Sequence, residues 1–398
     1  MSSGFGKKKS NTLMPIVCRI DFLAIMFVSM GFMSRLFSSG EKSVLGIDIG
    51  SSSIKVVELR RQGGKAVLQT YGELALGPYA NTEIGRATNL EAKDVGKALA
   101  DLLRECKATS KTCGVAIPFN SSLISIIEIP AVSQRELATI VPIEARKYIP
   151  VPIAEVSLDW SVIPRSKDAP DFNQTAIKDG VKKDKIDVLM VAIHNDTIKR
   201  YQDIVKAANL EALFFEIEIF STIRALLENN PEPVMVLDMG AASTKLYIVE
   251  RGIIRNSHTI NKGSQDITLS LSSVLGISIE QAELLKRGLI PPRAGQETSI
   301  QEVFSSVLGY IFTDTQRVLL NYQKKYGKSL NKVYLVGGGV KLRGFIEDAR
   351  KGLQVDVIPG DPFSKVEMPA FLQSMVNVTG PEFTVAVGIA LRRLQDMG

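Results

Sequence analysis

The chain has 398 residues, of which 45% are hydrophobic and 23% charged, with a net charge of +6 at pH 7 and a pI near 9.0. These values are typical of a globular protein with an ample core, and the positive charge is too small and too diffuse to indicate nucleic-acid binding. It remains compatible with a surface beside anionic lipid. Three cysteines without paired or CxxC spacing are typical of a reducing cytosol, and only two histidines argue against a histidine-based metal site.

The first forty residues differ from the rest of the chain. Three lysines at residues 7–9 precede a mostly apolar stretch, whose uninterrupted part, residues 22–33, is too short to span a bilayer. The segment has the outline of a signal peptide but no evident small-residue cleavage site. Two interpretations stay open. Translation begins at Met30 or Met33 and the preceding residues are not native sequence, or the segment is a peripheral membrane anchor.

Residues 44–59 form the first informative motif, VLGIDIGSSSIKVVEL. Two runs of β-branched and aliphatic residues flank a turn of glycine and serine, and this pattern predicts a β-hairpin. Asp48 ends the first strand inside an apolar run, where a carboxylate is normally excluded. Because the turn has no bulky side chain, we expect its backbone N–H groups to be free to face a bound anion.

The next 150 residues alternate between strand and helix patterns. Strands are expected at residues 65–74, 112–118, 121–129, 156–163 and 186–193, and helices at residues 90–107 and 196–208. Ser133 and Glu136 form a capping-box pattern that predicts the start of another helix, and Pro150 and Pro152 close that helix. The polar segment 165–185 predicts a solvated loop between two strands.

The first motif returns at residues 234–249, VMVLDMGAASTKLYIV. Without a gap, the second copy matches Asp238 to Asp48, Gly240 to Gly50, Ser243 to Ser53 and Lys245 to Lys55. A spacing of 190 residues is too long for a solenoid and suits two duplicated domains. Two facing turns would hold a polyphosphate, and the two aspartates would hold Mg²⁺ through its waters. The alternative is two unrelated buried hairpins with capping aspartates.

A third motif is glycine-rich. Residues 332–336 predict a short strand, three consecutive glycines follow at 337–339, and residues 345–353 predict a helix. The glycines let the backbone come close to a flat or bulky group, and the following helix start favours negative charge. The sequence has neither a P-loop motif nor the glycine fingerprint of a dinucleotide-binding domain.

These three motifs, in this order, resemble the actin-like ATPase superfamily. The resemblance implies an α/β fold of two duplicated actin-like (ribonuclease H-like) domains around a nucleotide cleft, which binds ATP and Mg²⁺. It implies a first phosphate loop from Asp48, Gly50, Ser51, Ser52 and Ser53, a second from Asp238, Gly240, Ala241 and Ser243, and an adenosine loop from Gly337, Gly338 and Gly339. Asp48 and Asp238 would be the Mg²⁺ residues. We do not expect Lys55 or Lys245 to contact phosphate.

Two further site assignments rest on the same resemblance. Glu218, at the start of a helix between the domains, would orient the attacking water as the catalytic residue, although a carboxylate at a helix start needs no such role. Glu283 and Lys286 lie one helical turn apart, and by resemblance to FtsA they would contact ribose and adenine. The alternative for that pair is a surface ion pair of little energetic value.

The strand–helix–strand–loop–strand segment resembles the insertion that the cell-division protein FtsA carries in its first domain. In detail, IEIP (residues 127–130), Glu144-Ala145, KYIPVPIAEV (147–156) and LDW (158–160) resemble the PilM family of type IV pilus assembly. That resemblance implies a cytoplasmic scaffold, peripheral at the inner membrane through its partners. It would bind ATP with weak ATPase activity at most and capture the cytoplasmic N-terminal peptide of PilN, in the PilN/PilO/PilP complex. Further partners would be the pilus assembly ATPases and a second copy of the chain, and none would be a nucleic acid.

The peptide groove would involve the strand at 121–129 and the helix at 136–148, and ATP would favour peptide binding by stiffening the cleft. The expected organisation is an N-terminal extension (1–40), a first subdomain in two parts (41–85 and 195–232), an insertion (86–194), a second domain (233–379) and a closing helix (380–398). One alternative is an FtsA-like division filament or anchor, which the lack of a C-terminal amphipathic helix disfavours. Another is an actin-fold ATPase or sugar kinase, which lacks an evident acidic sugar pocket here.

Overall fold

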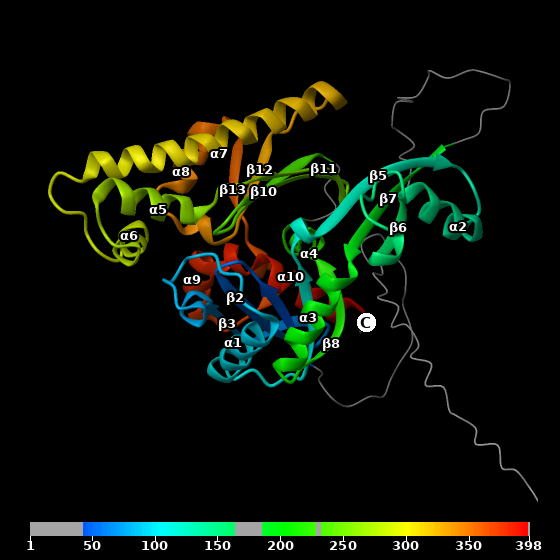
Figure 1. The fold of residues 1–398 in the computed structure, drawn as a ribbon, viewed down its shortest axis with the longest axis horizontal. Helices are drawn as coiled ribbons and strands as arrows, with labels where there is room; N and C mark the ends of the chain where they lie inside the picture. Colours follow the sequence, from blue (N-terminus) through cyan, green and yellow to red (C-terminus); the bar gives the residue numbers. More distant parts are fainter. Residues whose placement is uncertain (1–42, 164–184, 228–231, 397–398) are drawn as a thin grey trace, which may run out of the picture.

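The computed structural model describes residues 43–163, 185–227 and 232–396. The expected N-terminal extension (1–40) and all but the last residue of the expected loop 165–185 lie outside these ranges. Three β-sheets organise the described part of the chain, and helices cover them (Figure 1).

The first sheet has six strands and contains the first hairpin. In order across the sheet these are β14 (Val366–Glu367), β3 (Lys65–Ala75), β2 (Ser53–Gln62), β1 (Ser43–Ile49), β4 (Thr112–Ile117) and β8 (Glu211–Ile217). β1, β2 and β3 pair antiparallel, whereas β4 runs parallel to β1 and β8 parallel to β4. The predicted hairpin is therefore confirmed, with Asp48 directly opposite Lys55.

Helices cover both faces of this sheet. They are α1 (Ala92–Glu105), α3 (Asn195–Ala207), α4 (Glu218–Leu226) and α10 (Thr384–Asp396). Alternate residues of β1 face opposite sides: Leu45 and Ile47 pack in the cluster that contains α1 and α3, and Val44 packs with α10. Gly46 allows α10 to approach, because a Cβ there would lie 2.0 Å from the carbonyl oxygen of Ala386.

The second sheet has five strands and contains the second hairpin. The strands are β11 (Ile253–Ile260), β10 (Thr244–Glu250), β9 (Val234–Met239), β12 (Lys332–Val336) and β13 (Asp356–Pro359). Four helices accompany it, α5 (Ser264–Leu275), α6 (Ile279–Lys286), α7 (Glu297–Tyr326) and α8 (Phe345–Leu353). On one face Met235 and Leu237 pack against Ile311 of α7 and Phe345 of α8. The register repeats the first hairpin, since Asp238 lies opposite Lys245.

The other face of the second sheet packs on the first half of the molecule. Ile219, Phe220 and Ile223 of α4 belong to the same buried cluster as Val236 and Tyr247 of β9 and β10. In Figure 1, α4 accordingly lies between the two large sheets. The two halves therefore share one apolar core, with α4 inside it.

The third sheet is small and projects to one side of the molecule (Figure 1). Its antiparallel strands are β5 (Ser122–Pro130), β7 (Lys185–His194) and β6 (Val156–Ile163), and a short helical turn, η3 (Phe119–Ser121), leads into β5. α2 (Gln134–Ala145) covers this sheet with Leu137 and Val141 in its core, and the capping box of Ser133 and Glu136 is confirmed.

The three-stranded sheet begins later in the chain than residue 86, where the insertion was expected to start. α1 packs on α3, and β4 pairs with β1, so both belong to the six-stranded sheet although they lie within the range 86–194. The chain also returns to the six-stranded sheet before the closing helix expected at residues 380–398. The strand β14, within the range 233–379 expected for the second domain, pairs with β3 of that sheet.

Among the described residues, one stretch, Ala370–Gln395, is long and apolar enough to cross a membrane by composition. It comprises α9 (Ala370–Thr379), the turn η7 (Gly380–Phe383) and most of α10. Because 72% of its most apolar window is buried inside the fold, a core helix of the protein explains this hydropathy.

Candidate functional site

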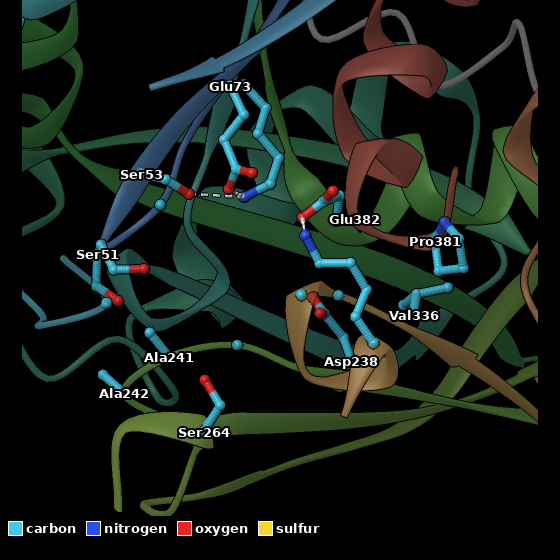
Figure 2. A pocket seen from close by; sticks show the side chains of 18 of the residues that line it. Ser51, Ser53, Glu73, Asp238, Ala241, Ala242, Ser264, Val336, Pro381 and Glu382 are labelled. Carbon is cyan, nitrogen blue, oxygen red and sulfur yellow. Dashed lines mark hydrogen bonds and ion pairs between the residues drawn. The ribbon is translucent and has the colours of Figure 1, made fainter. Parts of the chain in front are cut away.

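A cleft with a volume of about 390 Å³ lies between the two hairpins. In Figure 2, Ser51 and Ser53 of the first turn lie across the cleft from Ala241 and Ala242 of the second. The site residues expected from the sequence that line it are Asp48, Gly50, Ser51, Ser52, Ser53, Glu218, Asp238, Gly240, Ala241, Ser243, Glu283, Lys286, Gly337 and Gly338. The fold thus brings residues that lie far apart in the sequence, from Asp48 to Gly338, to the walls of one cleft.

The two turns have the same internal geometry. The N–H of Gly50 donates to the carbonyl oxygen of Ser53 over 2.9 Å, and that of Gly240 to Ser243 over 3.0 Å. Other turn carbonyls accept from backbone N–H groups of later segments: Ser51 from Thr88, Ser52 from Leu76, Gly240 from Ser264 and Ala241 from Gln265. In a trans peptide the N–H points opposite to the carbonyl, so the N–H groups of the residues that follow point away from these donors. N–H groups directed in this way would be able to bind an anion in the cleft.

Asp48 and Asp238 both line the cleft, and each carries a carboxylate close enough for the charge of Asp238 to act on Asp48. Burial, together with repulsion from Glu218 and Asp238, raises the pKa of Asp48 to about 6, although Lys55 and Lys245 oppose the shift. Burial and the charge of Glu218 likewise raise the pKa of Asp238. A divalent cation would relieve this repulsion, so the two carboxylates fit the expected Mg²⁺. Within the described ranges, no group of three His, Cys, Asp or Glu side chains that could hold a metal ion is present.

Glu218 begins α4 and is nearly buried, with 9% of its side chain exposed. One carboxylate oxygen accepts the backbone N–H of Phe119 over 2.6 Å, and the Nζ of Lys245 lies 2.7 Å from the same oxygen. The other oxygen accepts from Lys245 over 2.8 Å. Both oxygens are therefore engaged by the protein, and the role of Glu218 in orienting a water stays a prediction.

The glycine-rich segment forms the third wall. β12 and α8 confirm the predicted strand and helix, and the glycines between them form the turn η5 (Gly338–Lys341). Gly337 has φ +87°, and a Cβ there would lie 2.4 Å from Oδ1 of Asp238. Only glycine therefore allows this turn to lie against the aspartate. Gly339 is buried against Met239 and lies outside the cleft lining, in contrast to the expected adenosine contact.

Glu283 and Lys286 form a buried cluster, so the alternative of a surface ion pair is wrong. The Nζ of Lys286 lies 2.7 Å from Glu283, and the two side chains are only 5% and 6% exposed. Thr268 and Arg287 also donate to Glu283, over 2.6 and 2.7 Å. Burial alone would raise the pKa of Glu283, but Lys286, Thr268 and Arg287 together lower it.

Several lining residues escaped the sequence analysis: Glu73, Ser264, Arg287, Lys341 and Glu382. Lys341 lies two residues after the last of the three glycines, and its Nζ is 2.6 Å from Glu382. Lys55 donates to Ser53 over 2.8 Å and lies 3.3 Å from Glu73, its partner across the strands β2 and β3. Local pattern could have indicated Lys341 and Glu73. Glu382 comes from η7, far along the chain, and had no such signal.

The fold and the cleft define an actin-like protein, with two related domains that enclose a cleft between paired Asp-Gly hairpins. The structure of the ethanolamine utilization protein EutJ from Carboxydothermus hydrogenoformans is similar at a TM-score of 0.51 and 16% identity, covering 88% of this chain and 90% of that one. The family model of the type IV pilus assembly protein PilM matches residues 46–394, so the chain belongs to the PilM family.

Two other similarities agree with this assignment. A solved structure of the PilM–PilN type IV pilus biogenesis complex is similar at a TM-score of 0.73 and 24% identity, covering 88% of this chain and 98% of that chain. The cell division protein FtsA of Neisseria meningitidis serogroup B is 24% identical over 351 residues, which are 79% of this chain and 82% of FtsA. The predicted actin-like fold is confirmed, and the three-stranded sheet with α2 fits the expected FtsA-type insertion.

Proposed function

We propose that this protein is an ATP-binding scaffold of type IV pilus assembly that lies at the cytoplasmic face of the inner membrane and captures the N-terminal peptide of PilN. Membership of the PilM family supports the pilus role. The observation that carries the nucleotide site is the cleft itself, where two turns of equivalent hydrogen bonding lie beside two aspartates of raised pKa. Through PilN, the scaffold would join the PilO and PilP proteins and the pilus assembly ATPases.

The ligand of the cleft is ATP with Mg²⁺ under this proposal. The turns would hold the phosphates, Asp48 and Asp238 would hold hydrated Mg²⁺, and Glu283 and Lys286 would lie at the ribose. Calorimetric titration with ATP tests this site. We expect ATP to bind in the presence of Mg²⁺. Its affinity should fall at least tenfold, about 1.4 kcal/mol, when EDTA removes the Mg²⁺. Binding that is absent, or indifferent to Mg²⁺, would contradict the proposed site.

The same geometry favours holding ATP over hydrolysing it. The carboxylate that would orient a water, Glu218, is held by the backbone N–H of Phe119 over 2.6 Å. We therefore expect slow ATP hydrolysis, measured as phosphate release by the purified protein. Turnover at the rate of a typical enzyme, about 10 per second, would replace the scaffold with an ATPase.

The partner peptide is proposed to bind at the three-stranded sheet. β5 is an edge strand of that sheet, so its outer backbone groups can pair with an extended peptide. Fluorescence anisotropy of a labelled PilN N-terminal peptide tests this, with a scrambled peptide of identical composition as control. Saturable binding of the native order alone supports the proposal, and equal binding of both peptides contradicts it. The related PilM–PilN complex supports the choice of partner.

A further inference from the structure

Two contacts join the second sheet to the turn η3, which leads directly into β5: one runs from Lys245 of β10 through Glu218, and the other comes directly from Thr259 of β11. The N–H of Phe119 donates to Glu218 over 2.6 Å, and the same carboxylate is 2.7 Å from the Nζ of Lys245. The hydroxyl of Thr259 donates to the side chain of Asn120 over 3.2 Å. Thr259 lies opposite Lys245 in the pairing of β10 with β11. Neighbouring residues of η3 are thus tied to two neighbouring strands of the second sheet, Phe119 to β10 through Glu218 and Asn120 to β11 directly.

The ion pair of Lys245 lies where an added phosphate would disturb it. Lys245 lines the cleft and is 18% exposed, and its Nζ also lies 3.9 Å from Asp238. The cleft lining carries six carboxylates and five cationic side chains, so a phosphate that contacts one of these cations competes with the carboxylate that already pairs with it. The other lysines of the cleft have partners that also line it: Lys55 has Glu73, Lys286 has Glu283 and Lys341 has Glu382. Lys245 differs because its carboxylate partner, Glu218, also holds a backbone group of η3.

Resting on the proposed nucleotide site, we propose that Lys245 and Glu218 relay occupancy of the cleft to the three-stranded sheet. A terminal phosphate competes with Glu218 for the ammonium of Lys245. This assigns a phosphate contact to Lys245, which the sequence analysis did not expect. Glu218 acts as a positioning residue for η3 and not as the group that orients water.

The consequence for β5 follows from charge. When Lys245 turns to the phosphate, the carboxylate of Glu218 loses its cationic partner. It then accepts a stronger hydrogen bond from the N–H of Phe119, because hydrogen bonds to an ionised acceptor are stronger. The turn η3 and the start of β5 are then held more firmly. The strand proposed to pair with the partner peptide is ordered by the nucleotide through one carboxylate.

Hydrogen–deuterium exchange of the full chain tests the relay, with ATP–Mg²⁺ as the probe and no partner peptide present. In the wild type, saturating nucleotide should slow exchange across residues 119–130. Lys245→Met should bind ATP–Mg²⁺ about tenfold more weakly, the equivalent of one charge-assisted hydrogen bond, and should lose the slowing when saturated. Glu218→Gln should also lose it, and Lys245→Arg should restore it.

Lys55→Met is the matched control, because Lys55 occupies the equivalent position of the first hairpin but pairs with Glu73. At saturation it should keep the slowing, and thermal melting checks that every variant is folded. Unchanged exchange at 119–130 in nucleotide-bound wild type, or equal slowing in folded, saturated Lys245→Met, would overturn the relay. Absence of nucleotide binding by the wild type would instead overturn the proposed function, and the relay with it.

Discussion

The ionised side chain of Asp48 lowers the stability of the nucleotide-free protein, and we expect its benefit to come only when a ligand is bound. Its pKa is raised from 3.8 to about 6, mainly by burial. The folded protein therefore holds this proton more tightly than the unfolded chain, so stability falls as pH rises between about 4 and 6 and stays reduced above that range. The cost above pH 6 is at most about 3 kcal/mol, and less where water in the cleft screens the charge.

We predict that Asp48→Asn makes the nucleotide-free protein more stable than the wild type at pH 8, by about 1–3 kcal/mol, while abolishing binding of ATP–Mg²⁺. Near pH 4 the difference should largely disappear. Urea denaturation at both pH values measures it. Asp101→Asn is a control for which the change in stability should have the opposite sign, because a hydrogen bond from Tyr79 lowers the pKa of Asp101. A stability difference for Asp48→Asn that is independent of pH would contradict this account.

Gly337 has two separate constraints, its backbone conformation and its neighbour. Gly337 and Gly276 both have positive φ, +87° and +61°, but only at Gly337 would a Cβ meet another group, Oδ1 of Asp238 at 2.4 Å. Gly276→Ala should cost about 1–2 kcal/mol of stability and leave nucleotide affinity unchanged. Gly337→Ala should cost more and weaken ATP binding at least tenfold. Equal effects of the two substitutions on ATP affinity would show that the contact with Asp238 does not matter.

At the scale of elements, a buried charge cluster ties β8, α4 and α10 together. Arg224 donates two hydrogen bonds of 2.7 Å to Glu216, and Arg392 donates a third of 3.0 Å. All three side chains are at most 8% exposed. Burial opposes ionisation, but the two arginines outweigh it and lower the pKa of Glu216. The cluster fixes the helix that carries Glu218.

We predict that Glu216→Gln destabilises the protein by about 3–5 kcal/mol, because it leaves two buried guanidinium groups without a counter-charge. Glu367→Gln is the control, since its pair with Lys65 is exposed and should contribute less than about 1 kcal/mol. Denaturant unfolding compares the two variants. A cost below about 1 kcal/mol for Glu216→Gln would mean that water or relaxation compensates the arginines.

Elements defined by local pattern could be predicted from the sequence. Both hairpins, the strand β12 and the helix α8 follow from short runs of apolar residues and glycine, and their register put Asp48 and Asp238 in one cleft. Elements defined by distant pairing could not. β14 has only two residues and exists through its pairing with β3, and Glu382 reaches the cleft from η7. The partners of Glu218 likewise depend on tertiary structure.

The whole molecule is built so that a ligand of the cleft contacts both halves. The two large sheets share a core around α4, the cleft is lined from both sheets, and the N–H of Ala87 in the first half donates to Gln265 in the second. A ligand that bridges these parts biases their relative position, and by linkage it changes the affinity of any partner that senses that position. We infer that binding of ATP and binding of the partner peptide are coupled in this way.

The most direct test is the affinity of a labelled PilN N-terminal peptide, titrated with and without saturating ATP–Mg²⁺. We predict tighter peptide binding with nucleotide in the wild type, and the weaker, nucleotide-independent value in the variant with both Asp48→Ala and Asp238→Ala. The peptide should tighten ATP binding by the same factor, since coupling is reciprocal. Peptide affinity that is identical with and without ATP–Mg²⁺ in the wild type would contradict the account of an ATP-gated scaffold.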